Sequence, residues 1–126
     1  MEFKDILYEV KDDYAHVTIN RPKVLNAFTP VTLQELKTAL DNAEKDKNVG
    51  VIILSGAGDR AFCAGGDMNW ESSKEFQDHE YEFHIHLTKC SKPIIAKVNG
   101  YAIGGGNHMA YFCDLTICLL YTSDAA

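Results

Sequence analysis

Two glycine-rich turns are the part of this sequence whose residue types and position could do chemistry. One runs from Ala61 to Asp67 (AFCAGGD) and the other from Asn99 to Gly106 (NGYAIGGG), and each precedes an expected helix. Amides at a helix start point outward at the positive end of the helix dipole, and glycine lets another molecule approach them closely. Two such turns brought together can direct two amides at one oxygen. That arrangement stabilises negative charge developing on a carbonyl during a reaction.

Two other interpretations of these glycines stay open from the residues alone. Glycine content by itself favours plain tight turns, because glycine is the default turn residue. Phosphate binding is a weaker alternative. The chain has no Gly-x-x-x-x-Gly-Lys-Ser/Thr motif, and Met109 occupies the third position of a Gly-x-Gly-x-x-Gly pattern that starts at Gly104.

Few titratable side chains accompany the turns. His108 could act as a base, because an unperturbed histidine has a pKa of about 6.5, or it could pack as an ordinary helix residue. Asp67 could line a pocket or cap the helix that follows. Cys63 could be a nucleophile only if its pKa were depressed. The remaining histidines are expected to be surface or packing residues: His16, His79, His84 and His86. No His-x-x-x-His pair offers zinc ligands on a helix, so no metal site is expected.

Composition excludes several classes of protein. The 126 residues carry a net charge of −6, which argues against nucleic-acid binding, since that needs a cationic face. No apolar run approaches the roughly 18 residues of a membrane span, and the N-terminus lacks a signal-peptide pattern. The four cysteines form no Cys-x-x-Cys pair, which indicates reduced thiols and a cytoplasmic location. The acidic residues near Glu75 and Glu80 are expected to form a solvated surface.

Alternating and apolar runs predict an α/β domain around the two turns. Strands are expected at 6–10, 15–20, 49–54, 94–98 and 114–117, and helices at about 30–45, 69–89 and 107–112. Thr29 and Pro30 suit a helix start, as a capping residue followed by proline in the first turn. A strand, a helix and a strand in this order imply a crossover connection and parallel pairing.

Three sequence blocks resemble the crotonase (enoyl-CoA hydratase/isomerase) superfamily. They are the segment from Ile19 to Phe28 (INRPKVLNAF), the first glycine turn, and the second turn with the segment from Cys113 to Ile117. The blocks occur in the order and spacing of the family and span most of residues 3–117. The resemblance implies an α/β fold of strand-strand-helix units wound as a spiral, assembled as homotrimers or hexamers, with an acyl-coenzyme A thioester as substrate.

The resemblance also implies roles for individual residues. The backbone amides of Ala64 and Gly105 would hold the thioester oxygen while an enolate forms. Coenzyme A would contact Lys23, Val24 and Leu25. The acyl pocket would be lined by Gly65, Gly66, Asp67, Met68, Tyr101 and Gly104. No metal or redox cofactor is implied, since coenzyme A arrives as part of the substrate.

His108 marks a departure from the hydratases of the family, which carry a catalytic glutamate at that position. The two turns look closer to the branch of 2-ketocyclohexanecarboxyl-CoA hydrolase and dihydroxynaphthoyl-CoA synthase, whose members also lack the glutamate. The synthases carry an arginine where this chain has Leu25, which favours ring cleavage or related carbon–carbon chemistry. An enoyl-CoA hydratase/isomerase and a non-catalytic acyl-CoA-binding protein are the alternatives.

The resemblance covers only the N-terminal half of the family's length. Residues 1–117 are therefore predicted to be the N-terminal part of a truncated crotonase-fold domain. Residues 118–126 do not resemble the family and are predicted to be a non-native tail. Because the later family residues complete the pocket, this polypeptide alone is expected to have little or no activity.

Overall fold

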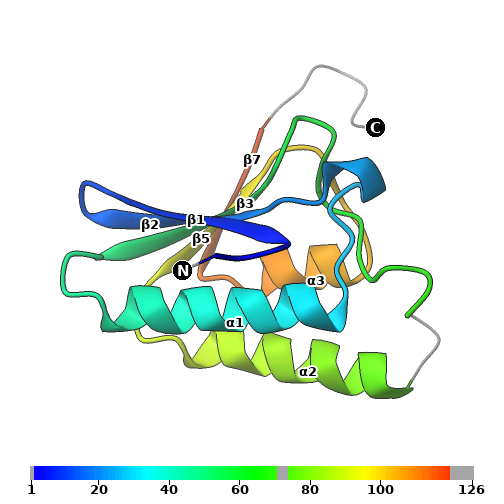
Figure 1. Cartoon of the computed structure of the whole chain (residues 1–126). Helices are drawn as coiled ribbons and strands as arrows, with labels where there is room; N and C mark the ends of the chain where they lie inside the picture. The colour runs from blue at the N-terminus through cyan, green and yellow to red at the C-terminus, as the bar shows by residue number, and fades with distance from the viewer. Residues whose placement is uncertain (1, 71–73, 120–126) are drawn as a thin grey trace.

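The main element of the fold is a five-stranded sheet with helices packed on one side (Figure 1). The computed structural model describes residues 2–70 and 74–119. The sheet has the order β1-β2-β3-β5-β7, and its strands are β1 (Ile6–Lys11), β2 (Tyr14–Ile19), β3 (Val51–Gly56), β5 (Ile94–Val98) and β7 (Leu115–Cys118). Strands β1 and β2 form an antiparallel hairpin, whereas every later pairing is parallel. The predicted α/β class with parallel crossovers is confirmed.

Helix α1 (Pro30–Lys45) begins where its sequence signals place it. The Thr29 side chain accepts a hydrogen bond from the Thr32 amide, and the Thr32 hydroxyl accepts one from the Thr29 amide. This reciprocal cap satisfies amides that would otherwise lack partners. The apolar face of the helix is buried, with Leu36 fully inaccessible, and it packs on β1, β2 and α2.

Helix α2 (Lys74–Lys89) lies beside α1 on the side away from the sheet (Figure 1). Among the described residues it starts at Lys74, because Met68 to Trp70 form a turn rather than the expected first helical residues. Its buried face carries Phe76, Phe83 and Leu87, together with His84. The apolar spacing therefore predicted the body of this helix correctly but not its start.

Two very short strands form a second sheet that the sequence did not predict. Strand β4 (Ala61–Cys63) pairs in parallel with β6 (Tyr101–Ala102). Each strand leads directly into one of the two glycine turns, and helix α3 (Gly105–Tyr111) follows the second turn. A short 3-10 helix, η1 (Pro22–Val24), precedes the segment that contacts the first turn. No helix in the described ranges is long and apolar enough to cross a bilayer.

Candidate functional site

The two glycine turns meet in the structure, as their predicted chemistry requires. The β4–β6 pairing aligns them, and the Ile103 amide donates to the Cys63 carbonyl at 3.1 Å. A side chain on Gly65 would have its Cβ 2.9 Å from the Ile103 carbonyl oxygen and 3.5 Å from the Gly105 nitrogen. Gly65 also has a φ of +100°, which favours glycine. The close approach of the turns therefore depends on the absence of a side chain at Gly65.

The amide of Ala64 is not available to hold a substrate oxygen, which corrects the prediction for this residue. It donates to the Leu25 carbonyl at 3.0 Å. This bond ties the first glycine turn to the segment after η1, so the amide has a structural role. A backbone amide has one proton to donate, so Ala64 would have to break this bond to bind a ligand.

Gly66 and Gly105 each present an amide without a hydrogen-bond acceptor in the described part of this junction. Neither nitrogen donates to an acceptor within residues 2–70 and 74–119. Next to Gly66, the Gly65 carbonyl accepts from the Phe28 amide and the Asp67 amide donates to the Phe28 carbonyl, which fixes the backbone on both sides of the Gly66 amide. Gly105 is the first residue of α3, where amides lack partners inside the helix. Gly66 is therefore a candidate donor in place of Ala64, and the role of Gly105 as a donor stays a prediction.

Two buried asparagines hold the turns in place, and the sequence prediction missed both. Asn26 donates to the carbonyls of Ala57 and Ala61 and accepts from the Arg21 amide. Asn99 donates to the carbonyls of Gly56 and Gly58 and accepts from the Gly56 amide. Each side chain bonds backbone groups at strand ends and in the adjoining loop, which fixes the backbone around the site.

Asp67 has a structural role in this chain. One carboxylate oxygen accepts from the Asn69 amide at 3.1 Å, which stabilises the turn that follows. The other oxygen lies 3.5 Å from the Arg21 guanidinium. Of the two interpretations that the sequence left open, the geometry supports a local cap supported by an ion pair.

The remaining predicted binding residues are on the surface of the chain. Lys23 and Val24 are exposed in η1, and Leu25 continues that segment. The Met68 side chain is 86% exposed and that of Tyr101 is 61% exposed. Gly104 has open space around it and a φ of +54°. These residues face solvent, and their contacts with coenzyme A and the acyl group stay predictions.

Cys63 lies beside the first turn but has the wrong electrostatics for a nucleophile. Its side chain is fully buried, and burial raises the pKa of the thiol to about 12. The reactive form of cysteine is the thiolate, which this environment suppresses. Cys113 is likewise buried, and burial also raises the pKa of its thiol to about 12. These two thiols are therefore core residues.

Helix α2 covers the glycine turns with residues that the sequence prediction did not select. Phe76 lies against Gly66, so closely that a Cβ there would be 2.1 Å from its ring. Glu80 lies against Gly105, with one carboxylate oxygen 2.2 Å from the position of a Cβ. The expectation that Glu80 belongs to a solvated acidic surface is therefore wrong. The i, i+4 spacing of Glu80 and His84 was the available signal.

His84 and His108 complete a polar group beside Glu80. The His84 ring is buried, and its Nε2 lies 3.5 Å from Glu80 Oε1. Its ring centroid is 5.8 Å from that of His108, which is exposed on α3. Burial lowers the pKa of His84, and the nearby His108 lowers it further, whereas Glu80 acts in the opposite direction. The imidazole is therefore kept neutral at neutral pH.

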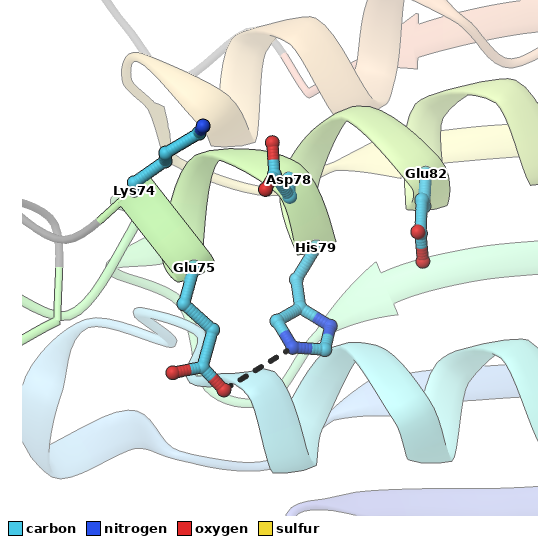
Figure 2. A pocket seen from close by; sticks show the side chains of 5 residues that line it. All are labelled: Lys74, Glu75, Asp78, His79 and Glu82. Carbon is cyan, nitrogen blue, oxygen red and sulfur yellow. Dashed lines mark ion pairs between the residues drawn. The ribbon is translucent and has the colours of Figure 1, made fainter.

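A depression on the outer face of α2 is separate from this site (Figure 2). It is lined by Lys74, Glu75, Asp78, His79 and Glu82. The dashed line in Figure 2 marks the ion pair between His79 Nε2 and Glu75 Oε1, which lie 3.7 Å apart. None of the predicted site residues lies in this depression.

Comparisons with known proteins agree with this geometry. Residues 9–121 match the family described as enoyl-CoA hydratase/isomerase. An enoyl-CoA hydratase/isomerase from Xanthobacter autotrophicus Py2 is 32% identical, with a TM-score of 0.87 over 93% of this chain and 46% of its own. An enoyl-CoA hydratase from Bacillus anthracis is 29% identical, with a TM-score of 0.84 over 91% of this chain and 47% of its own.

The match extends over nearly all of this chain but over less than half of either solved structure. The two glycine turns, the parallel crossovers and the sequence match all agree on one family. The chain belongs to the enoyl-CoA hydratase/isomerase family and has the α/β crotonase fold.

Proposed function

We propose that this chain supplies the thioester-binding half of an acyl-CoA enzyme that stabilises an enolate. The observation that carries the proposal is the pair of unoccupied amides at Gly66 and Gly105, brought together by the β4–β6 pairing. Fixed amides oriented at a carbonyl oxygen oppose the charge that develops on it, and removal of one such donor typically costs about 100- to 1,000-fold in rate. Coenzyme A is proposed to contact the exposed segment from Lys23 to Leu25.

The substrate is proposed to be an alicyclic or enoyl-CoA thioester, with ring-cleaving hydrolysis or related carbon–carbon chemistry. His108 at the position of the hydratase glutamate supports this choice, with His108 as the candidate base. Glu80 is a second candidate base, because its carboxylate lies against Gly105. The whole protein is proposed to be a cytoplasmic homotrimer or hexamer.

Two alternatives rest on the same residues. An enoyl-CoA hydratase/isomerase would use Glu80 or His108 in place of the usual glutamate. A non-catalytic acyl-CoA-binding protein would keep the two amides without the chemistry. Incubation of the full-length protein, of which this chain supplies one half, with crotonyl-CoA and with 2-ketocyclohexanecarboxyl-CoA, followed by mass spectrometry, separates the three. The products would be a hydrated thioester, a ring-opened diacid thioester, or unchanged substrate despite binding.

A pair of variants at Gly105 tests the amide itself. Gly105→Pro removes the N–H at the first position of α3, where proline is compatible with a helix. Gly105→Ala adds a comparable Cβ but keeps the N–H, so it controls for crowding against Glu80 and Phe28. We expect calorimetry with crotonyl-CoA to show about tenfold or greater loss of affinity for the proline variant relative to the alanine variant. Equal affinities would overturn the proposed role of Gly105.

A further inference from the structure

Three ligand-type side chains come together where helices α2 and α3 meet. They are Glu80, His84 and His108, and each offers one ligand atom within 4.8 Å of the other two. Glu80 and His84 are one helical turn apart on α2, and His108 reaches them from α3. Only the contact between the two helices creates the group, so no sequence spacing reveals it.

His84 is the residue that needs an explanation. It is 8% exposed, and neither ring nitrogen has a hydrogen-bond partner within residues 2–70 and 74–119. A buried polar group without a partner destabilises the folded state, because it has lost its hydrogen bonds to water. The face of its ring packs against Phe112, and the two ring centroids lie 5.2 Å apart in a stacked arrangement. The apolar contacts are therefore satisfied, while the Nε2 atom faces the Glu80 carboxylate at 3.5 Å.

The distances fit a divalent ion that takes nitrogen and oxygen ligands. Zinc binds histidine nitrogen and carboxylate oxygen at about 2.0–2.2 Å, so neighbouring ligand atoms in a tetrahedral site lie about 3.4 Å apart. The Glu80–His84 separation of 3.5 Å already meets this requirement. His108 is exposed, so its side chain can move by the small distance that remains. Two histidines and one carboxylate leave an open coordination position.

We propose that Glu80, His84 and His108 form a binding site for a divalent transition-metal ion of the Zn²⁺ class. The ion supplies the partner that the buried His84 ring lacks. It also neutralises the carboxylate that α2 holds against Gly105. No metal site was predicted from the sequence, because the usual His-x-x-x-His spacing is absent and the ligands come from two helices.

The other carboxylate–histidine pairs of the chain lack these features. The Glu75–His79 pair has the same i, i+4 spacing, but both side chains are well exposed, and within residues 2–70 and 74–119 no third ligand accompanies them. It therefore provides a matched control on the same helix. His86 already has a hydrogen-bond partner in Asp41 at 2.8 Å.

Isothermal titration of the chelator-treated chain with ZnCl₂ tests the site without any thioester. We expect one saturable site per chain. Glu80→Gln and His108→Ala should each weaken zinc binding by at least about tenfold, because even outer-shell changes at metal sites cost about 10- to 100-fold. Glu75→Gln and His79→Gln should leave it unchanged. Co²⁺ in place of Zn²⁺ should give visible absorption bands that the first two variants lose.

The proposal would be overturned if the chain showed no saturable zinc binding, or if the control variants lost as much binding as Glu80→Gln and His108→Ala. Loss of zinc binding in Cys118→Ser would also overturn it, because the ion would then be bound by an exposed thiol. His84 is buried, so its variant could misfold, but Glu80→Gln and His108→Ala decide the question without it. Because the titration contains no acyl-CoA, its failure leaves the proposed function untouched. The thioester experiments are done in the presence of a chelator, so a bound metal ion cannot affect their outcome.

Discussion

Gly106 shows how far a single residue determines the second glycine turn. A Cβ at this position would lie 2.0 Å from the Cys63 carbonyl oxygen, closer than any real contact. The start of α3 can therefore approach β4 only because Gly106 has no side chain. The backbone on both sides would have to move to accept one.

We accordingly expect Gly106→Ala to lower the free energy of unfolding by about 1–3 kcal/mol, the usual cost of overpacking. Urea denaturation followed by circular dichroism measures it. Gly50→Ala is the matched control, because its Cβ would meet the Asp13 carbonyl at an ordinary 3.6 Å. Equal destabilisation by the two substitutions would show that the close contact at Gly106 is unimportant.

At the scale of elements, Asn99 joins the end of β3 to the turn after β5. Its amide group donates to the carbonyls of Gly56 and Gly58 at 2.8 and 2.6 Å, and its oxygen accepts from the Gly56 amide. Asn99→Asp keeps the shape but replaces both donors by a carboxylate oxygen that faces two carbonyls. The buried acceptors would then lose their partner.

The expected result for Asn99→Asp is a loss of about 1–3 kcal/mol or more in stability at neutral pH. Chemical denaturation measures the change, and Asn48→Asp on an exposed position serves as the control. Lowering the pH should restore part of the loss, since a protonated carboxyl can donate one hydrogen bond. A variant as stable as the parent would show that the asparagine does not hold the turn.

The strands and helices also show which features could be predicted from the sequence. The strands of the main sheet and helix α1 were predictable, because long apolar or alternating runs and the Thr29 cap report burial and helix starts directly. Strands β4 and β6 were not, since segments this short carry no periodicity. The donor role of Gly105 follows from its motif and stays a prediction. Ala64 was wrong as a donor, because its bond to Leu25 depends on a contact between distant segments.

For the whole molecule, two histidines with lowered pKa values, the buried His84 and the partly buried His16, make stability depend on pH. Burial lowers the pKa of His84, and it also lowers that of His16, whose ring contacts Ser55 at 2.8 Å. In the unfolded chain both should titrate near about 6.5. Below that value the unfolded state takes up protons before the folded state does. The stabilisation that comes from keeping these histidines neutral is therefore complete above about pH 6.5. It is lost as the pH falls toward their lowered pKa values in the folded state.

We expect the urea midpoint of the chelator-treated chain to fall between about pH 7 and about pH 5. His84→Gln should reduce this pH dependence, while His79→Gln, at a much more exposed position, should not. This window lies above the range in which Glu44, whose pKa is lowered by hydrogen bonds from Ser91, would contribute. A midpoint that rises on acidification would contradict the assignment of a neutral buried His84.

Helix α2 has a consequence for how such a protein can change its specificity. The proposed oxygen-binding donors belong to the main chain of two turns, so side-chain substitutions elsewhere leave them intact. The groups that α2 presents to those turns, Phe76 against Gly66 and Glu80 against Gly105, come from one continuous segment. Under the proposed function, selectivity for the acyl group and oxygen binding would therefore be encoded in separate segments of the sequence. Exchange of the segment between Gly66 and Pro93 alone would then change the selectivity and preserve the oxygen binding.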